Sequence, residues 1–306
     1  MVNTETRPKP RVVFFGSGPV AARSLELLTE HCDIEAVVTK PKPAHHRGTF
    51  PVLDLARRLK FPVQTVSSKT ELDDLMASNP FKSDLGVLID FGIIVSQAVI
   101  DYFPRGIVNS HFSILPEWRG ADPITFAILS GQPTTGVSLM LLVAALDEGP
   151  LLAFGEYELP PNVTTPVLTE HLINLSDMLL RAELPNYLEG RRQGAPQTIT
   201  GRQVSYSRKL TKEDGRVDWS KPAVQLEREV RAYIDWPKSR ATLAGKDVII
   251  TEAHVTDKNG TPGEPITDGN ELTVYCGKQA LTLDHLKPAG KQEMTRADFI
   301  RGYLNK

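Results

Sequence analysis

Short apolar segments alternate with segments of helical periodicity through the first third of the sequence, and this pattern limits the possible fold more than any other feature. The predicted strands are residues 11–15, 34–39, 62–66, 84–90 and 106–111. The predicted helices between them are residues 19–31, 51–59 and 71–78. Strands that are apolar on both faces and separated by helices are typical of a parallel sheet covered by helices on both sides. We therefore expect an α/β fold with a Rossmann-like, mostly parallel sheet, in which Val20, Leu25, Leu27 and Leu28 of the first helix face inward.

The second half of the sequence predicts a change of architecture. Two more strands at 135–142 and 151–159 and a long helix at 165–189 complete the first part, and residues 191–205 have the Gly, Pro and polar content of a linker. A helix at 223–233 then precedes short strands, predicted at 240–245, 247–255, 271–276 and 280–286. Many short strands separated by turns favour a small β-barrel of the OB type. The expected organisation is a first domain at 1–190, a linker at 191–205 and an OB-like domain at 206–306.

Charge is unevenly divided between these two parts. Residues 1–190 hold 15 Lys and Arg against 22 Asp and Glu, a net charge of −7, whereas residues 191–306 hold 20 against 15, a net charge of +5. Chance variation between two solvated surfaces is one explanation. The other is a basic second domain that binds a polyanion.

Cysteine content and the absence of targeting signals bear on location. Cys32 and Cys276 are too few for a disulfide framework and lack metal-ligand spacing, which favours a reducing compartment. The first residues are polar, unlike a signal peptide. No apolar run reaches the roughly 18 residues of a membrane span. We therefore expect a cytoplasmic protein that needs no metal.

The segment GSGPVA (16–21) follows a predicted strand and opens a predicted helix, so it matches the G-x-G-x-x-A pattern of dinucleotide-binding turns. A nicotinamide-dependent oxidoreductase is therefore one functional hypothesis. The second strand ends in VVTKPKP, however, with no acidic residue for a ribose hydroxyl. A tight strand-to-helix turn is therefore the favoured explanation of the glycines.

The segment KPKPAHHRGTF (40–50) is basic and has no apolar pattern. Its cationic and imidazole side chains are Lys40, Lys42, His45, His46 and Arg47. Adjacent histidines rarely reach one metal ion, and no carboxylate lies nearby in the sequence. A basic loop that contacts a phosphate backbone is therefore favoured over a metal site.

Asn109 and His111 occupy alternate positions at the end of the predicted strand 106–111. Alternate residues of a strand point to the same side, and parallel sheets bind ligands at the carboxyl ends of their strands. A lone histidine here would most often be structural, but an amide and an imidazole together can donate to one developing oxyanion. Asp147 is a candidate to orient His111 and to assist proton transfer. Because no Ser or Cys lies in a nucleophile elbow, the site suits direct attack on an activated carbonyl carbon.

Four short motifs occur in an order that resembles the 10-formyltetrahydrofolate-dependent formyltransferases, above all those that act on methionyl-tRNA. The elements Asn-x-His, Ser-x-Leu-Pro, Trp-Arg-Gly and Leu-Asp-x-Gly are present as NSH, SILP, WRG and LDEG. Residues 204–237 also look like the start of the C-terminal domain of those enzymes. The resemblance therefore covers nearly the whole chain.

The resemblance implies formyl transfer from 10-formyltetrahydrofolate to the α-amino group of methionine on initiator tRNA, a reaction of translation initiation. Catalysis would rest on Asn109, His111 and Asp147. The folate-binding turn would be Ser113, Ile114, Leu115 and Pro116. Arg47, in an insertion loop, and Lys209 would bind tRNA. The implied partners are initiator Met-tRNA and folate, and we expect a monomer.

Some positions depart from the family's usual pattern: Phe112, Glu117, Ala145 and Pro150. None of these departures removes a catalytic residue, so they bear on pocket shape and efficiency, as the short loop around Arg47 bears on tRNA binding. Sugar-nucleotide formyltransferases share the Asn-His-Asp site and are the main alternative, although they should lack the segment KLTKEDGRVDW (209–219) and a basic second domain. A hydrolase of the same folate would use water and need no tRNA surface.

Overall fold

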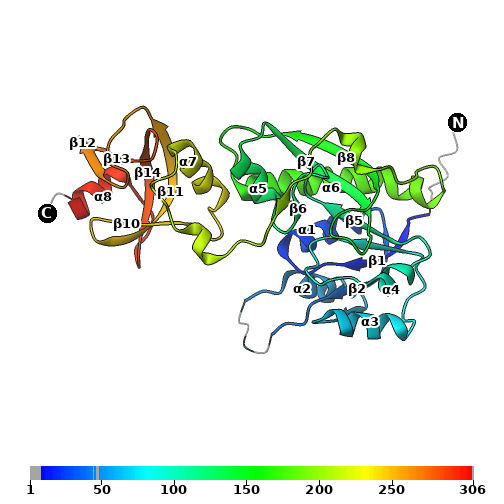
Figure 1. The fold of residues 1–306 in the computed structure, drawn as a ribbon. Helices are drawn as coiled ribbons and strands as arrows, with labels where there is room; N and C mark the ends of the chain where they lie inside the picture. Colours follow the sequence, from blue (N-terminus) through cyan, green and yellow to red (C-terminus); the bar gives the residue numbers. More distant parts are fainter. Residues whose placement is uncertain (1–7, 44, 46–47, 305–306) are drawn as a thin grey trace, which may run out of the picture. The chain divides into compact units, whose positions relative to one another are not determined.

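Figure 1 shows a computed structural model of the chain, which describes residues 8–43, 45 and 48–304. The chain divides into two compact units that interleave along the sequence. The first unit contains residues up to 120, 135–157 and 169–206, and the second contains 121–134, 158–168 and residues from 207 onward. The contiguous domain boundaries expected from the sequence stay a prediction. No helix in the described ranges is long and apolar enough to cross a membrane.

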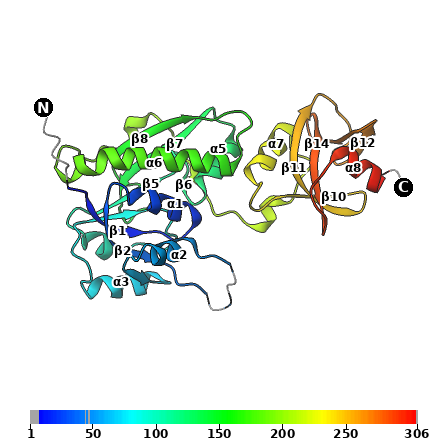
Figure 2. The same ribbon diagram turned by 180° about the vertical axis from the view of Figure 1, so that it is seen from behind.

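The first unit is built on a seven-stranded sheet with the order β3-β2-β1-β4-β5-β7-β8, which Figure 2 shows from behind. The strands are β1 (Arg11–Phe15), β2 (Asp33–Thr39), β3 (Val63–Thr65), β4 (Leu85–Leu88), β5 (Ile107–His111), β7 (Thr134–Leu141) and β8 (Leu151–Glu158). Strands β1 to β5 pair in parallel, whereas β7 is antiparallel to β5. The predicted Rossmann-like, mostly parallel sheet is therefore confirmed.

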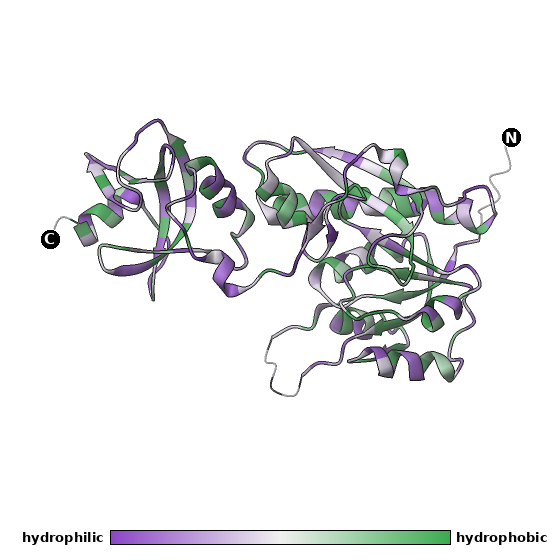
Figure 3. Cartoon of the chain, in the orientation of Figure 1, coloured by the Kyte–Doolittle hydropathy of each residue, from purple (hydrophilic) through white to green (hydrophobic). Residues whose placement is uncertain are grey.

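Helices cover this sheet, whose strands are largely apolar in Figure 3. The helices of this unit are α1 (Pro19–Leu28), α2 (Pro51–Arg58), α3 (Lys69–Ala77), α4 (Gln97–Asp101) and most of α6 (Thr165–Leu188). Helices α3 and α4 share a core with β1, β2 and β5, in which Phe15 meets Phe91 and Phe103 edge to face at centroid distances of 5.6 and 5.8 Å. This core anchors the strands whose ends carry the polar residues of interest.

Helix α1 differs from the expectation in length and in its buried face. It ends at Leu28, and its buried positions are Ala21, Ser24, Leu25 and Leu28, whereas Val20 and Leu27 are only half-buried. The reason is a close approach of the helix to the strand before it. A Cβ placed on Gly16 would lie 2.6 Å from the Cβ of Ala21 and 2.8 Å from the carbonyl oxygen of Ile89, so only small residues fit there.

The second unit contains an antiparallel sheet with the order β10-β11-β14-β13-β12, on which β15 pairs with β14. Its strands are β10 (Ser239–Leu243), β11 (Lys246–Thr256), β12 (Pro265–Asp268), β13 (Glu271–Tyr275), β14 (Ala280–Pro288) and β15 (Met294–Thr295). Helix α7 (Ala223–Ala232) contributes Leu226 and Val230 to the core of this sheet. A second, predominantly β domain is therefore confirmed.

Two segments that precede residue 169 in the sequence join the second unit, which the sequence did not predict. They are α5 (Pro123–Ser130) with its flanking residues, and residues 158–168. Arg228 of α7 donates to the carbonyl of Ser130 at 3.3 Å, and Arg231 donates to the carbonyl of Val163 at 2.8 Å. Thr165 also donates to the carbonyl of Ala232 at 2.7 Å. These side-chain contacts attach both segments to α7.

Candidate active site

Strand β5 holds Asn109 and His111 on one face and Ser110 on the other. Ile107, two residues before Asn109, is on the same face and packs into the core beside α4. Along this face, the side chains therefore change from apolar to polar toward the end of the strand. On the opposite face, the hydroxyls of Ser110 and Ser176 are hydrogen bonded at 2.7 Å, which ties β5 to α6. Asn109 and His111 are only 6% and 7% exposed. Both polar side chains are thus held at the strand end in a largely desolvated place.

His111 is contacted at both ring nitrogens. Its Nε2 is 3.0 Å from the carbonyl oxygen of Trp118, and its Nδ1 is 3.8 Å from Oδ2 of Asp147. The Trp118 carbonyl can only accept, so Nε2 carries the hydrogen in this arrangement. The distance to Asp147 is too long for a hydrogen bond but short enough for strong attraction between a buried carboxylate and an imidazolium. The expected closeness of these two residues is therefore present, without a direct hydrogen bond.

Asp147 is held in a strained turn between β7 and β8. Its φ is +50°, a left-handed conformation that Asp tolerates better than most residues. The backbone N–H of Gly120 donates to Oδ2 of Asp147 at 2.7 Å. The turn folds back on β7 so closely that a Cβ on Gly149 would lie 1.7 Å from the carbonyl oxygen of Leu141. The spacing of Leu-Asp-x-Gly follows from this geometry, because only glycine fits at its last position.

Hydrogen bonds within the chain fix the turn at residues 113–116. Ser138 of β7 donates to the carbonyl of Ser113 at 2.8 Å and accepts from the N–H of Leu115 at 3.0 Å. The hydroxyl of Thr200 donates to the carbonyl of Leu115 at 2.9 Å. The Leu115–Pro116 peptide bond is cis. This turn is a rigid edge beside the end of β5, as a binding surface requires.

The amide of Asn109 makes no side-chain hydrogen bond within the described part of the chain, although the residue is buried. Buried amides are normally paired within the protein or with a bound molecule. This amide is therefore available to a ligand at the end of β5. Together with His111 it could supply two donors to a single oxygen atom.

The glycine-rich turn after β1 has the close packing of a structural turn. The N–H of Ser17 donates to the carbonyl of Asp90 at 3.0 Å, and a Cβ on Gly18 would lie 1.9 Å from Oδ2 of Asp90. A carboxylate therefore stands against the turn where a dinucleotide would place its pyrophosphate. This arrangement favours a tight turn over nicotinamide binding.

Two positions that depart from the family's usual pattern are buried beside the site. Glu117 is 8% exposed, and its Oε2 lies 3.7 Å from Nη1 of Arg202. Phe112 is 6% exposed. Pro150 accepts a hydrogen bond from the N–H of Leu141 at 2.9 Å, whereas Ala145 is exposed. None of these four residues displaces Asn109, His111 or Asp147 from the arrangement described above.

The structure does not test the residues expected to contact tRNA. Arg47 lies outside the described residues, and Lys209 is exposed at the start of the second unit's main segment. Among the described residues, no group of three His, Cys, Asp or Glu side chains could hold a metal ion. Gln197, a residue with no distinguishing signal in the sequence, lies against the Asp147 turn: its Nε2 donates to the carbonyl of Asp147 at 2.7 Å.

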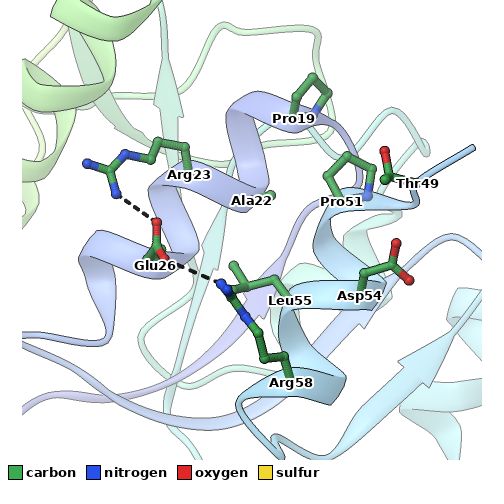
Figure 4. Close-up of a pocket in the computed structure, with 9 residues that line it drawn as sticks. All are labelled: Pro19, Ala22, Arg23, Glu26, Thr49, Pro51, Asp54, Leu55 and Arg58. Atoms are coloured by element: carbon green, nitrogen blue, oxygen red, sulfur yellow. Dashed lines mark hydrogen bonds and ion pairs between the residues drawn. The ribbon is translucent and has the colours of Figure 1, made fainter.

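A separate pocket of about 490 Å³ lies between α1 and α2 and is shown in Figure 4. Its lining residues are Pro19, Ala22, Arg23, Glu26, Thr49, Pro51, Asp54, Leu55 and Arg58. Glu26 pairs with Arg23 at 2.7 Å and with Arg58 at 3.4 Å, so both cations are already engaged across the pocket. None of the candidate catalytic residues lines it.

Comparison with known proteins identifies the family of this chain. A family model described as "Formyl transferase" matches residues 10–181, more than half of the chain, and one described as "Formyl transferase, C-terminal domain" matches residues 209–304. The chain belongs to the formyl transferase family. Asn109, His111 and Asp147 all lie in the part matched by the first model.

The similarity to individual relatives extends over nearly the whole length of this chain. The methionyl-tRNA formyltransferase of Myxococcus xanthus is 36% identical over 300 residues, covering 96% of each chain. The methionyl-tRNA formyltransferase of Chloroflexus aggregans is 37% identical over 305 residues, covering 95% of this chain and 97% of its own.

Two solved structures share the fold. An N-formyltransferase from Helicobacter canadensis, in complex with folinic acid and dTDP-3-aminofucose, has a TM-score of 0.68 at 16% identity and covers 90% of this chain and 99% of its own. HypX from Aquifex aeolicus, in complex with tetrahydrofolic acid, has a TM-score of 0.65 at 17% identity over 97% of this chain. The match spans about half (48%) of the HypX chain.

Proposed function

We propose that this formyltransferase moves the formyl group of 10-formyltetrahydrofolate to the α-amino group of methionine on initiator tRNA. The observation that carries the proposal is the meeting of Asn109, His111 and Asp147 at one strand end, in a chain whose relatives over 96% of its length are methionyl-tRNA formyltransferases. Such an enzyme would work in the cytoplasm, where tRNA is aminoacylated. We further propose that it acts as a monomer.

The described residues fit a folate donor at the end of β5. The free amide of Asn109 and the preformed turn at Ser113–Pro116 lie at this strand end, and both would face the bound donor. 10-Formyltetrahydrofolate supplies the formyl group and leaves as tetrahydrofolate. The amino nitrogen forms a bond to the formyl carbon, the bond from that carbon to the folate nitrogen breaks, and the proton lost by the amine ends on the folate nitrogen.

Asn109 and His111 would stabilise the charge that develops on the formyl oxygen. In the structure, Nε2 of His111 is engaged by the carbonyl of Trp118, whose φ of +56° is itself unusual. The formyl oxygen would take the place of this carbonyl as the acceptor. Asp147, close to Nδ1, would stabilise the imidazolium that forms when His111 takes up the amine proton.

We propose tRNA as the acceptor on two grounds: the net charge of residues 191–306 and the similarity to methionyl-tRNA formyltransferases. The formal net charge of residues 191–306 is +5, as expected for a part of the chain that contacts phosphates. We propose that Arg47 and Lys209 contribute to tRNA binding. The alternative, formylation of an amino-sugar nucleotide, is raised by the ligand in the Helicobacter canadensis structure. The relatives at 36–37% identity favour the tRNA acceptor.

The deciding experiment offers the protein 10-formyltetrahydrofolate with one of three acceptors: methionyl-tRNA, free methionine or an amino-sugar nucleotide. The reaction is followed by transfer of labelled formyl to each acceptor. We expect transfer to methionyl-tRNA alone. Preferential transfer to the sugar nucleotide would overturn the acceptor, and release of formate without transfer would indicate a hydrolase.

A further inference from the structure

Residues 195–205 contact both loops of the candidate active site, although their composition predicts a linker. The backbones of Ala195 and Leu151 exchange hydrogen bonds of 2.7 and 2.8 Å, next to the Asp147 turn. Farther along, the N–H of Ser205 donates to the carbonyl of Pro116 at 3.2 Å, and the N–H of Arg119 donates to the carbonyl of Ser205 at 3.0 Å. This segment therefore supports the folate-side turn and the Asp147 turn at once.

Gln197 makes the central contacts of this segment. It is 7% exposed, and its Nε2 donates to two carbonyls, those of Asp147 at 2.7 Å and Gly149 at 3.0 Å. Its Oε1 accepts from Nη2 of Arg119 at 2.7 Å. Both N–H groups of the side-chain amide are used, and its oxygen is also occupied. A buried amide with this set of partners is specific for glutamine, because no other side chain of that length offers two donors and an acceptor.

These contacts bear directly on the orientation of Asp147. A left-handed aspartate is uncommon and persists only where its surroundings hold it. Gln197 fixes the carbonyl of Asp147 itself and the carbonyl two residues later. Through Arg119, it also holds the residue that precedes Gly120, whose N–H binds the Asp147 carboxylate. One side chain thus joins the backbone of the turn to strand β6 (Arg119–Gly120), whose Gly120 N–H orients the Asp147 carboxylate.

We propose that Gln197 is the positioning residue for Asp147, holding the carboxylate at the distance from His111 at which it can stabilise an imidazolium. The proposal rests on the proposed function, in which Asp147 acts on proton transfer through His111. The Gln197 amide is fully engaged by Arg119 and the Asp147 turn, so the proposal gives it no direct contact with either substrate. Its loss should therefore lower kcat while leaving the KM for folate unchanged, because the Ser113–Pro116 turn keeps its own contacts to Ser138.

Two variants test whether the hydrogen bonds of Gln197, and not only the size of its side chain, are required. Gln197→Met keeps the length of the side chain and loses all three hydrogen bonds. Gln197→Glu keeps the acceptor for Arg119 but cannot donate to the two carbonyls as a carboxylate. We expect each to lower kcat about 100-fold, the cost of a displacement of about 1 Å at the reacting groups. Gln193→Met, at an exposed glutamine just before the segment, is the matched control and should behave as the wild type.

A double-mutant cycle tests whether Gln197 acts through Asp147. Single-turnover rates of formyl transfer are measured for Gln197→Met, Asp147→Asn and the double variant, with thermal unfolding recorded for each. If Gln197 acts by placing the carboxylate, Gln197→Met should change the rate of the Asp147→Asn protein by less than twofold or so, since neighbouring residues that act together are non-additive.

The outcomes are distinguishable. Equal losses in both backgrounds would mean that Gln197 has a general structural role, and the inference would be wrong. Wild-type kcat in Gln197→Glu would also overturn it, because the donors would then be dispensable. If instead Asp147→Asn kept full turnover, the proposed role of Asp147 would fail, and the positioning role with it.

Discussion

Asp147 faces His111 across two loops, with its Oδ2 3.8 Å from the Nδ1 of the imidazole, while the same oxygen accepts a hydrogen bond from Gly120 at 2.7 Å. The carboxylate is therefore oriented by backbone and acts on the imidazole through its charge. Both side chains are largely buried, so this attraction is less screened than between exposed groups. This closeness is what the proposed role of Asp147, acting through His111, requires.

Removal of either proposed oxyanion donor should slow the chemical step. Asn109→Ala and His111→Ala are each expected to lower turnover by roughly 100- to 1,000-fold, as for other donors of this kind. Steady-state formylation of methionyl-tRNA, with thermal unfolding as a check on folding, measures the effect. Asn174→Ala, on the exposed side of α6, is the control and should retain activity. A folded Asn109→Ala protein with normal turnover would rule out the proposed oxyanion site.

At Asp147, where φ is +50°, two substitutions can separate an effect on catalysis from an effect on stability. Asparagine tolerates this conformation, so Asp147→Asn should fold as stably as the wild type while turnover falls roughly 100- to 10,000-fold, the range of general acid–base contributions. Asp147→Ala should lose, in addition, about 1–2 kcal/mol of unfolding free energy from the left-handed backbone. Turnover and chemical denaturation are measured on both variants. Equal stability of the two would contradict the strain argument.

Binding of tRNA should weaken steeply with salt. Each phosphate neutralised by a Lys or Arg contributes a slope of about −0.9 to the plot of log K against log[salt] for a duplex. Residues 191–306, with their net charge of +5, motivate this expectation. Affinity for methionyl-tRNA is measured between low and physiological salt, with folate affinity as the comparison. A flat dependence for tRNA would favour a small-molecule acceptor.

Arg47 should matter to the tRNA acceptor and not to folate. A guanidinium can form paired hydrogen bonds with phosphate oxygens, which an ammonium cannot. Arg47→Lys keeps the charge but should still impair formylation of methionyl-tRNA, with folate affinity unchanged. Parallel titrations of the variant and the wild type with each ligand provide the test. Equal weakening of both ligands would mean that the substitution disturbs the fold, and no change in either would remove Arg47 from the tRNA site.

The second unit should lose stability in acid through Asp214. Hydrogen bonding from Arg208 holds the pKa of Asp214 below its usual value, with Thr211 as a further donor. Because the folded pKa is depressed, the stabilisation is fully present above the unfolded pKa of about 3.9 and is lost as pH falls through the folded pKa.

Asp214→Asn should therefore be less stable than the wild type at pH 7, with the difference shrinking below about pH 4. Thermal unfolding across this pH range measures it. Asp257→Asn, at an exposed carboxylate that makes no hydrogen bond or ion pair with a described residue, is the control. A difference that persisted unchanged at low pH would argue against the Arg208 contact as its source.

Much of the first unit could be predicted because its strands are buried on both faces and are therefore apolar throughout. The runs at 11–15 and 106–111 correspond to β1 and β5. Helix α4 could not be predicted because five residues are too short for a clear helical period. Helix α5 could not be predicted because its sequence, PITFAILS, is almost uniformly apolar and shows no alternation of polar and apolar faces. The second β domain was predictable from the spacing of its turns.

The site could be predicted only in part. Asn109 and His111 could be identified because they are polar at positions where a buried strand is expected to be apolar. Asp147 could be identified from the Leu-Asp-x-Gly motif that contains it. Gln197 gives no such signal, because polar and Pro-rich composition is the same for a free linker and for a segment that packs through its backbone and a single amide. Nor could the contact of His111 with the Trp118 carbonyl be foreseen, since it depends on the left-handed φ of Trp118.

The hydrogen bonds of residues 195–205 also set a limit on how far this enzyme can be shortened. A chain cut after residue 190 would retain Asn109, His111 and Asp147, and with them all of the first family match at residues 10–181. It would lose Gln197, Thr200 and Ser205, and so the partners of Asp147, Leu115 and Pro116. If Asn109, His111 and Asp147 act as proposed, this shortened chain should lose formyl transfer although it keeps all three side chains. A shortened chain that retains the hydrogen bonds of residues 195–205 has to extend at least to Ser205.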